Sequence, residues 1–198
     1  MDLEEWLNIY KKIVHDFGFS ELEDEKAARV LHELASSKLL DSSVLDIIRG
    51  KNVAVVGGAY SGEKIEEDFI ITAGKAIEKV NFIPDIHVTD IEEDSSLLAE
   101  LEKRGCILVI HAHGDNIHRL YEVIPKLERF VGTTQVIPFD KVYNFGGFTD
   151  GDRAAIIAKK FGAKKISLYG FDFKLARDKV KQKKLRWAEK ILKIEGII

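Results

Sequence analysis

Histidine and aspartate residues follow an apolar segment in the middle of the chain. The segment HAHGDN (His111–Asn116) comes directly after the apolar segment CILVI (Cys106–Ile110), which predicts a buried strand. The packing of a strand does not require two imidazoles and a carboxylate at its end. Imidazole and carboxylate groups together are ligands for zinc, whereas carboxylate oxygens are typical ligands for Mg²⁺. The segment therefore predicts a functional site at the end of this strand.

The spacing of His111, His113 and Asp115 resembles the HxHxD part of the zinc motif in metallo-β-lactamase-type hydrolases. Here Asn116 takes the place of the next histidine and His118 is the only later one, so a two-metal site would lack its downstream imidazole ligands. We favour histidines that end a strand and bond to the backbone over zinc ligands. A zinc metallohydrolase is the alternative from a different enzyme class.

Carboxylates also occur at or near other predicted strand ends and helix starts. Together with Asp115, these residues are Asp90, Glu92, Asp150 and Asp172. Carboxylates that are brought together repel each other unless a cation lies between them, and hard oxygen ligands select Mg²⁺. A single aspartate can equally cap a helix, so the group is stronger evidence than any of its members. The group predicts a Mg²⁺ site.

The glycine-rich segment GGAYSGEK (Gly57–Lys64) follows the first predicted strand. Glycines in a turn after a strand let backbone N–H groups approach phosphate. The segment differs from a P-loop, because it has one residue too many between Gly62 and the lysine and no Ser or Thr after the lysine. It also lacks the GxGxxG pattern of dinucleotide sites. Tight turns explain Gly57 and Gly58 as well as phosphate contact does.

Short β-branched segments alternate with helical patterns after residue 50, which predicts an α/β fold. Such alternation is typical of a mostly parallel sheet with helices on both faces, and ligands bind such sheets at the carboxyl ends of the strands. We expect about six strands, at residues 52–58, 69–72, 85–90, 106–113, 133–139 and 165–172.

The chain divides into a helical N-terminal region, residues 1–50, and an α/β catalytic domain with a C-terminal helix, residues 51–198. In the first region, Ser20 and Glu23 have the spacing of a capping box, and a third short helix is expected to end near Gly50. The basic segment Lys174–Lys190 has apolar residues, Leu175 among them, at helical spacing. It predicts an amphipathic helix with a solvated basic face.

Composition limits the function classes. The chain has 198 residues, 45% of them hydrophobic, which is enough for a globular core. Its formal net charge of −3 gives no case for nucleic-acid binding. No apolar segment is long enough to span a membrane, and the N-terminus does not resemble a signal peptide. The single cysteine, Cys106, excludes an intrachain disulfide. We expect a cytoplasmic protein.

Four segments together carry a family resemblance: PDIHVTDIEED (Pro84–Asp94), HAHGDN, GTTQ (Gly132–Gln135) and the long segment from Asn144 to Phe173. They resemble the archaeal 6-hydroxymethyl-7,8-dihydropterin pyrophosphokinase (MptE-like) family, which is related in fold to thiamin pyrophosphokinases. The resemblance covers about residues 52–175. It implies transfer of diphosphate from ATP to the hydroxymethyl group of a reduced pterin, releasing AMP, with Mg²⁺, in tetrahydromethanopterin or folate biosynthesis.

The resemblance also implies roles for individual residues. Mg²⁺ would be held by Asp90, Glu92, Asp115 and Asp150. Catalysis would involve Asp115, Asp150, His113 and Arg153. ATP would contact Gly57, Gly58, His111, Gly114, Asn116, Thr133 and Gln135. The pterin would be framed by Asn144, Phe145, Phe148 and Asp172. The related fold further suggests a homodimer.

Two segments depart from the family pattern. Glu92 stands where the family usually has an aspartate followed by glycine, and ITAGKA (Ile71–Ala76) stands where the family tends to have ADGA. Within the same fold, another hydroxymethyl heterocycle such as thiamin is the alternative acceptor. A non-catalytic nucleotide-binding module is a third alternative, which ATP binding without AMP release would favour.

Overall fold

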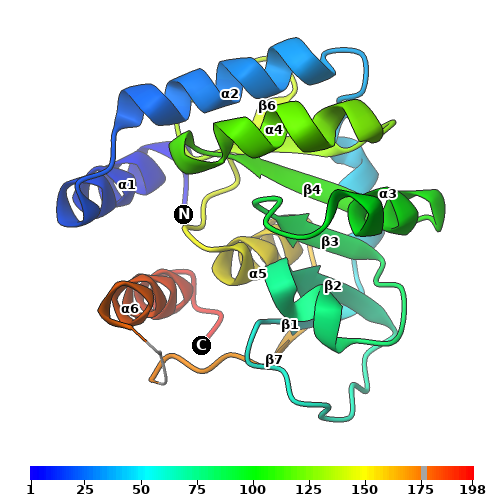
Figure 1. Ribbon diagram of the computed structural model, residues 1–198. Coiled ribbons are helices and arrows are strands. Elements are labelled where there is room, and N and C mark those ends of the chain that lie inside the picture. The colour runs from blue at the N-terminus through cyan, green and yellow to red at the C-terminus, as the bar shows by residue number, and fades with distance from the viewer. Residues whose placement is uncertain (175–177) are drawn as a thin grey trace.

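Seven parallel strands form one sheet in the computed structural model, which describes residues 1–174 and 178–198 (Figure 1). Their order across the sheet is β6-β5-β4-β3-β2-β1-β7. The strands are β1 Asn52–Val56, β2 Phe69–Ala73, β3 Ile86–Thr89, β4 Ile107–Ala112, β5 Val131–Thr134, β6 Val142–Tyr143 and β7 Lys165–Tyr169. The parallel α/β sheet is as the sequence predicts. The strand beyond the expected six is β6, whose two residues are too few for a sequence pattern.

The bounds expected for one strand were wrong. The pattern predicts residues 133–139, whereas β5 ends at Thr134. The chain leaves the sheet at Gln135, whose carbonyl accepts a hydrogen bond from Trp6 Nε1 at 2.9 Å. Pro138 has no N–H group to offer a neighbouring strand. The chain therefore contacts the N-terminal region, instead of a neighbouring strand, directly after β5.

Six α-helices and four short 3₁₀ helices are present in the described residues. They are α1 Leu3–Phe17, α2 Glu21–Ala35, α3 Ser95–Lys103, α4 Ile117–Val123, α5 Asp150–Lys160 and α6 Lys179–Ile194, with η1 Ser42–Ile48, η2 Gly74–Lys79, η3 Gly114–Asn116 and η4 Ile124–Lys126. The Ser20 side chain caps α2 by accepting the Glu23 N–H, which is one of the two hydrogen bonds of the expected capping box. The expected third helix of the N-terminal region is η1.

Helices cover both faces of the sheet, as Figure 1 shows for α2 and α4 on one side and α5 on the other. The side chains of β4 alternate between these faces. Ile110 belongs to the same apolar cluster as Leu31 of α2 and Leu120 of α4, whereas Val109 packs in a second cluster with Ala154 of α5. This period of two is the consequence of strand geometry. Each face thus buries its own apolar core.

Helix α6 packs against α5 near the C-terminal end of the chain. Ala188, Ile191 and Leu192 are buried, whereas the basic residues of the helix remain partly or fully exposed. Leu175, expected on the apolar stripe of this helix, lies outside the described residues. None of the described helices has the length and apolar composition that a membrane span requires.

Candidate active site

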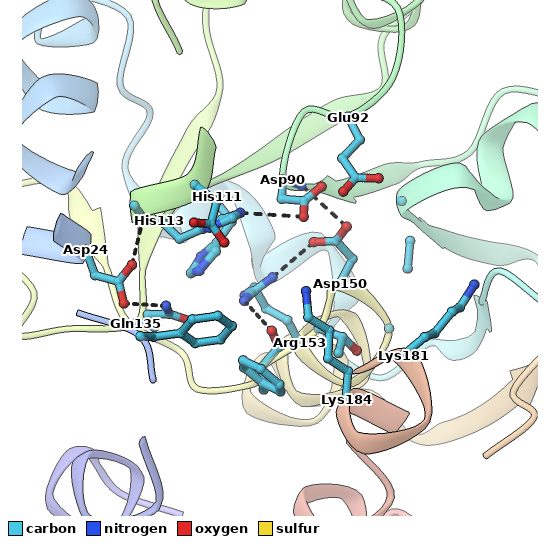
Figure 2. A pocket seen from close by; sticks show the side chains of 18 of the residues that line it. Asp24, Asp90, Glu92, His111, His113, Gln135, Asp150, Arg153, Lys181 and Lys184 are labelled. Carbon is cyan, nitrogen blue, oxygen red and sulfur yellow. Dashed lines mark hydrogen bonds and ion pairs between the residues drawn. The ribbon is translucent and has the colours of Figure 1, made fainter. Parts of the chain in front are cut away.

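A cleft of about 600 Å³ opens at the carboxyl ends of strands β1 to β5 (Figure 2). Residues that follow the five strands line it, represented by Gly58, Gly74, Asp90, His113 and Gln135. The turn before α5 and the first residues of this helix, Phe148–Gly151 and Arg153, complete this side, which we call the strand-end wall. The expected position of the site, at the carboxyl ends of the parallel strands, agrees with this cleft.

A second side of the cleft comes from segments at the two ends of the chain. It contains Gly18–Ser20 between α1 and α2, Glu23 and Asp24 of α2, and Lys181 and Lys184 of α6. We call this side the flanking wall. None of its residues was expected at a site from the sequence.

Asp90 and Asp150 lie side by side in the strand-end wall. The Asp150 carboxylate accepts the Asp90 N–H at 3.4 Å and a hydrogen bond from Arg153 Nη1 at 3.0 Å. Burial, together with the charge of Asp90, raises the pKa of Asp150 well above its ordinary value. Burial also acts to raise the pKa of Asp90, but the hydrogen bond and charge of His113 outweigh it and the pKa is lowered. The two carboxylates therefore compete for ionisation.

The turn before α5 places Asp150 and Arg153. Gly147 has φ +94°, and a Cβ there would lie 2.5 Å from the Arg153 Cα, so only glycine fits. Thr149 then caps the helix in a reciprocal capping box with Asp152. Arg153 is 3% exposed, and its Nη2 donates to the Gly147 carbonyl at 3.3 Å. The sequence NFGGFTDGDR thus builds a rigid helix start at the cleft.

His111 offers a buried acceptor atom to the cleft. The Thr133 hydroxyl donates its hydrogen to the Ile110 carbonyl at 3.0 Å, so it must accept from His111 Nδ1 at 3.1 Å. His111 Nε2 is then unprotonated, and no described residue donates a hydrogen bond to it. Burial and the nearby Arg153 charge lower the pKa of His111 well below its ordinary value. The imidazole is therefore neutral and ready to accept a hydrogen bond.

Asn116 joins the ends of β3 and β4. Its side-chain amide donates to the carbonyls of Asp90 and His111, both at 2.8 Å, and its oxygen accepts the His113 N–H at 3.1 Å. His113 Nε2 in turn lies 3.6 Å from the Asp90 carboxylate. Asn116 thus holds the two loops in register from behind the cleft.

Asp24 joins the N-terminal helices to the strand-end wall. Its carboxyl group is 4% exposed and accepts hydrogen bonds from the Tyr10 hydroxyl at 2.5 Å, the Gly114 N–H at 2.7 Å and Gln135 Nε2 at 2.7 Å. A Cβ on Gly114 would lie 2.8 Å from the Glu23 Cβ, so glycine permits this close approach. The helices of the first 50 residues are therefore part of the site.

Aromatic side chains gather where the two walls meet. Phe17 and Phe19 stack with their ring centroids 5.1 Å apart, and Phe148 lies 5.3 Å from Phe17. Phe19 and Phe148 both line the cleft. They form an apolar end of the cleft that can receive a flat ring.

Eleven of the predicted site residues line the cleft. They are Gly58, Asp90, Glu92, His111, His113, Gly114, Asp115, Gln135, Phe148, Asp150 and Arg153. Asp115 and Glu92 are exposed at the rim, and Glu92 pairs with Lys75 at 3.4 Å. The tightly associated part of the predicted Mg²⁺ group is therefore Asp90 with Asp150.

The structure places the other six predicted residues outside the cleft lining. Thr133 and Asn116 support His111 and Asp90 from behind, and Gly57 is packed so closely that a Cβ would lie 2.9 Å from the Gly170 carbonyl oxygen. The pterin-framing residues Asn144, Phe145 and Asp172 bond or stack elsewhere: Asn144 donates to the Val136 carbonyl, Phe145 stacks on Tyr143 and Asp172 accepts the Lys174 N–H. Their substrate contacts stay predictions.

Some of the residues that sequence analysis missed carry a readable signal. Asp24 lies three, four and seven residues before Ala27, Ala28 and Leu31, which places a carboxyl group on the buried face of a helix. Gly74 follows a predicted strand, and a Cβ there would lie 2.9 Å from Asp150 Oδ2. Lys181 and Lys184 share a helix face by their spacing of three. Nothing in the sequence shows that this face meets the cleft.

The donor atoms fit a hard cation such as Mg²⁺. Asp90 and Asp150 lie beside each other, and burial together with the charge of Asp90 raises the pKa of Asp150. A cation between the two carboxylates would relieve their repulsion. Within the described residues, no group of three or more His, Cys, Asp or Glu side chains is placed to hold a metal ion. Mg²⁺ commonly uses one or two carboxylates and completes its shell with water and substrate phosphates.

Comparison with known proteins finds relatives over most of the chain. Three curated relatives each bear the name 6-hydroxymethyl-7,8-dihydropterin pyrophosphokinase. The protein from Methanocaldococcus jannaschii is 35% identical, with 97% of this chain and 95% of the relative covered. Those from Pyrococcus furiosus and Methanothermobacter thermautotrophicus are 37% and 34% identical, each with 87% of this chain and 79% of the relative covered.

The profile of a protein family described as 6-hydroxymethylpterin diphosphokinase MptE-like matches residues 37–178. The match contains the whole sheet and the strand-end wall, whereas the flanking wall lies outside it. Because the match covers well over half of the chain, and the relatives align with most of it, the chain belongs to the MptE-like family.

Proposed function

We propose that this protein transfers a diphosphate group from ATP to the hydroxymethyl group of 6-hydroxymethyl-7,8-dihydropterin, with Mg²⁺. The names of the three relatives and of the family support the reaction. The structural observation that carries this proposal is that one cleft has a charged end and an apolar end. Asp90, Asp150 and Arg153 form a charged end, and Phe19 with Phe148 forms an apolar end.

The reaction joins the hydroxymethyl oxygen to the β-phosphorus of ATP. The bond between that phosphorus and the oxygen bridging it to the α-phosphorus breaks, AMP leaves with this oxygen, and the hydroxyl proton is released. Bound Mg²⁺ would neutralise phosphate charge. Such transfer depends on positioning and charge stabilisation more than on a protein base.

The residues of the cleft suit these tasks. Asp90 and Asp150 would hold Mg²⁺, and Arg153 fixes the orientation of Asp150. The neutral His111 Nε2 would accept a hydrogen bond from a donor on the substrate, such as the hydroxymethyl O–H. Phe19 and Phe148 would stack on the pterin. His111 is a weak base because its pKa is lowered, so its role would be to orient the hydroxyl group.

Thiamin as the acceptor and a zinc hydrolase are both less well supported. The family and the relatives are named for pterins. His111 Nδ1 is occupied by Thr133, and Asp115 is exposed at the rim, so the HxHxD residues are not gathered around one point. We further propose a cytoplasmic enzyme of tetrahydromethanopterin or folate biosynthesis that acts as a homodimer.

The test is AMP release from ATP and Mg²⁺, measured by chromatography with and without 6-hydroxymethyl-7,8-dihydropterin. We expect pterin-dependent AMP and pterin diphosphate in equal amounts. Asp150→Asn should lower the rate about 100-fold or more, because it removes a carboxylate that would hold Mg²⁺ at the reacting phosphates. Asp68→Asn, which changes an exposed carboxylate outside the cleft lining, is the matched control. Absence of pterin diphosphate with the wild-type protein would refute the assignment.

A further inference from the structure

The cleft contains far more acidic than basic side chains. Seven acidic residues line it: Glu23, Asp24, Asp90, Glu92, Glu93, Asp115 and Asp150. The Lys and Arg residues of the lining are Lys75, Arg153, Lys181 and Lys184. A triphosphate is strongly anionic, so its binding to such a cleft requires positive charge that the protein does not already use.

Two of the four basic side chains are already paired within the cleft. Arg153 bonds to Asp150 at 3.0 Å, and Lys75 lies 3.4 Å from Glu92. Lys181 and Lys184 have no ion-pair partner within 4.0 Å among the described residues. Both residues line the cleft, and Figure 2 shows the Lys184 side chain extending from α6 toward Asp150, whereas the Lys181 side chain points away from Asp150. These two ammonium groups are therefore available for a ligand.

Contacts with α1 fix the orientation of α6. The Asp16 carboxylate accepts a hydrogen bond from Trp187 Nε1 at 2.8 Å and pairs with Lys183 at 2.8 Å. Ala188 and Ile191 of the same helix are buried. Lys183 and Trp187 are four residues apart and face α1, while Lys181 and Lys184 face the cleft. The free lysines thus have a defined direction.

We propose that Lys181 and Lys184 bind phosphate oxygens of the nucleotide triphosphate, so that α6 is a phosphate-binding element. The inference rests on the proposed function for the identity of the nucleotide. It assigns a role to residues beyond the family match, which ends at residue 178. Lysine suits this task because its ammonium group is a mobile point charge that can follow the phosphates.

Isothermal titration calorimetry with α,β-methylene-ATP and Mg²⁺ tests the proposal, because this analogue cannot be cleaved at the reacting bond. The variants are Lys181→Met, Lys184→Met and the double variant. Arg186→Met removes one charge from an exposed position of the same helix outside the lining and is the matched control. Lys184→Arg tests rescue by a retained charge. Adenosine, which lacks phosphates, is titrated in parallel.

We expect each single Met variant to weaken the affinity for the analogue about tenfold and the double variant more strongly. Arg186→Met and Lys184→Arg should stay within about threefold of the wild type. Adenosine affinity should be the same in all variants, which a loss of structure would not allow. Unchanged analogue affinity in the double variant, equal losses for adenosine and analogue, or a wild type that does not bind the analogue would each overturn the proposal.

The two proposals fail in different ways. The titrations contain no pterin, so a loss of analogue affinity in the variants supports the role of the lysines even if no pterin diphosphate forms. Conversely, pterin diphosphate formation together with unchanged analogue affinity in the double variant would leave the proposed function standing and remove the role of α6.

Discussion

The two walls of the cleft differ in how the chain assembles them. The strand-end wall consists of residues that parallel strands bring to one edge, and it carries the paired groups Asp90, Asp150 and Arg153. The flanking wall consists of segments more than 150 residues apart in sequence, Gly18–Asp24 and Lys181–Lys184. Topology positions the first wall, whereas particular side-chain contacts position the second. We therefore expect substitutions in the first wall to affect turnover and those in the second to affect assembly and binding.

The largest expected effect is on kcat, and it should differ between two neighbouring carboxylates of the strand-end wall, Asp90 and Glu92. Asp90→Asn should lower kcat about 100-fold or more, because Asp90 lies beside Asp150 at the charged end of the cleft. Glu92→Gln should lower it less than about tenfold, because Glu92 is exposed and paired with Lys75. Steady-state kinetics of AMP release measures both. Equal losses would show that Glu92 acts with Asp90, as the family resemblance implies.

A smaller effect, on the free energy of unfolding, is expected from substituting Asp24, which joins the two walls by hydrogen bonds. Asp24→Asn exchanges an acceptor of three buried hydrogen bonds for a side chain that brings its own donors. We expect the free energy of unfolding to fall by about 2–3 kcal/mol. Urea denaturation measures this change, and Glu25→Gln, at a partly exposed position of α2, is the control. A loss below about 0.5 kcal/mol would mean that the flanking wall does not depend on Asp24.

The same difference explains which parts of the molecule could be predicted from the sequence. Alternating apolar segments indicated the parallel sheet, and its carboxyl edge then placed Asp90, His113 and Asp150 near one another. Lys184 gave no such indication, because an amphipathic helix reports which face is buried but not which partner the polar face meets. Asn116 and Thr133 were predicted as ligand contacts, and this stays a prediction; their hydrogen bonds to His111 and to the Asp90 carbonyl could not be predicted, since tertiary packing sets hydrogen-bond direction.

The smallest expected effect concerns pH and lies entirely within the strand-end wall. Burial and Arg153 lower the pKa of His111 in the folded protein below its unfolded value near 6.5. The unfolded chain therefore binds a proton that the folded state does not, and stability should fall as the pH drops below about 6.5. One such group contributes up to about 1.4 kcal/mol per pH unit.

His111→Gln removes this titration and should flatten the pH dependence of the free energy of unfolding between pH 7.5 and about 5.5. His118→Gln, at an exposed position of α4, should leave it unchanged. Urea denaturation at several pH values gives both slopes. If the free energy of unfolding of His111→Gln depends on pH as steeply as that of the wild type, then His111 is not the neutral, buried acceptor that its bond to Thr133 indicates. The proposed hydrogen bond from the substrate to His111 Nε2 would then be unsupported.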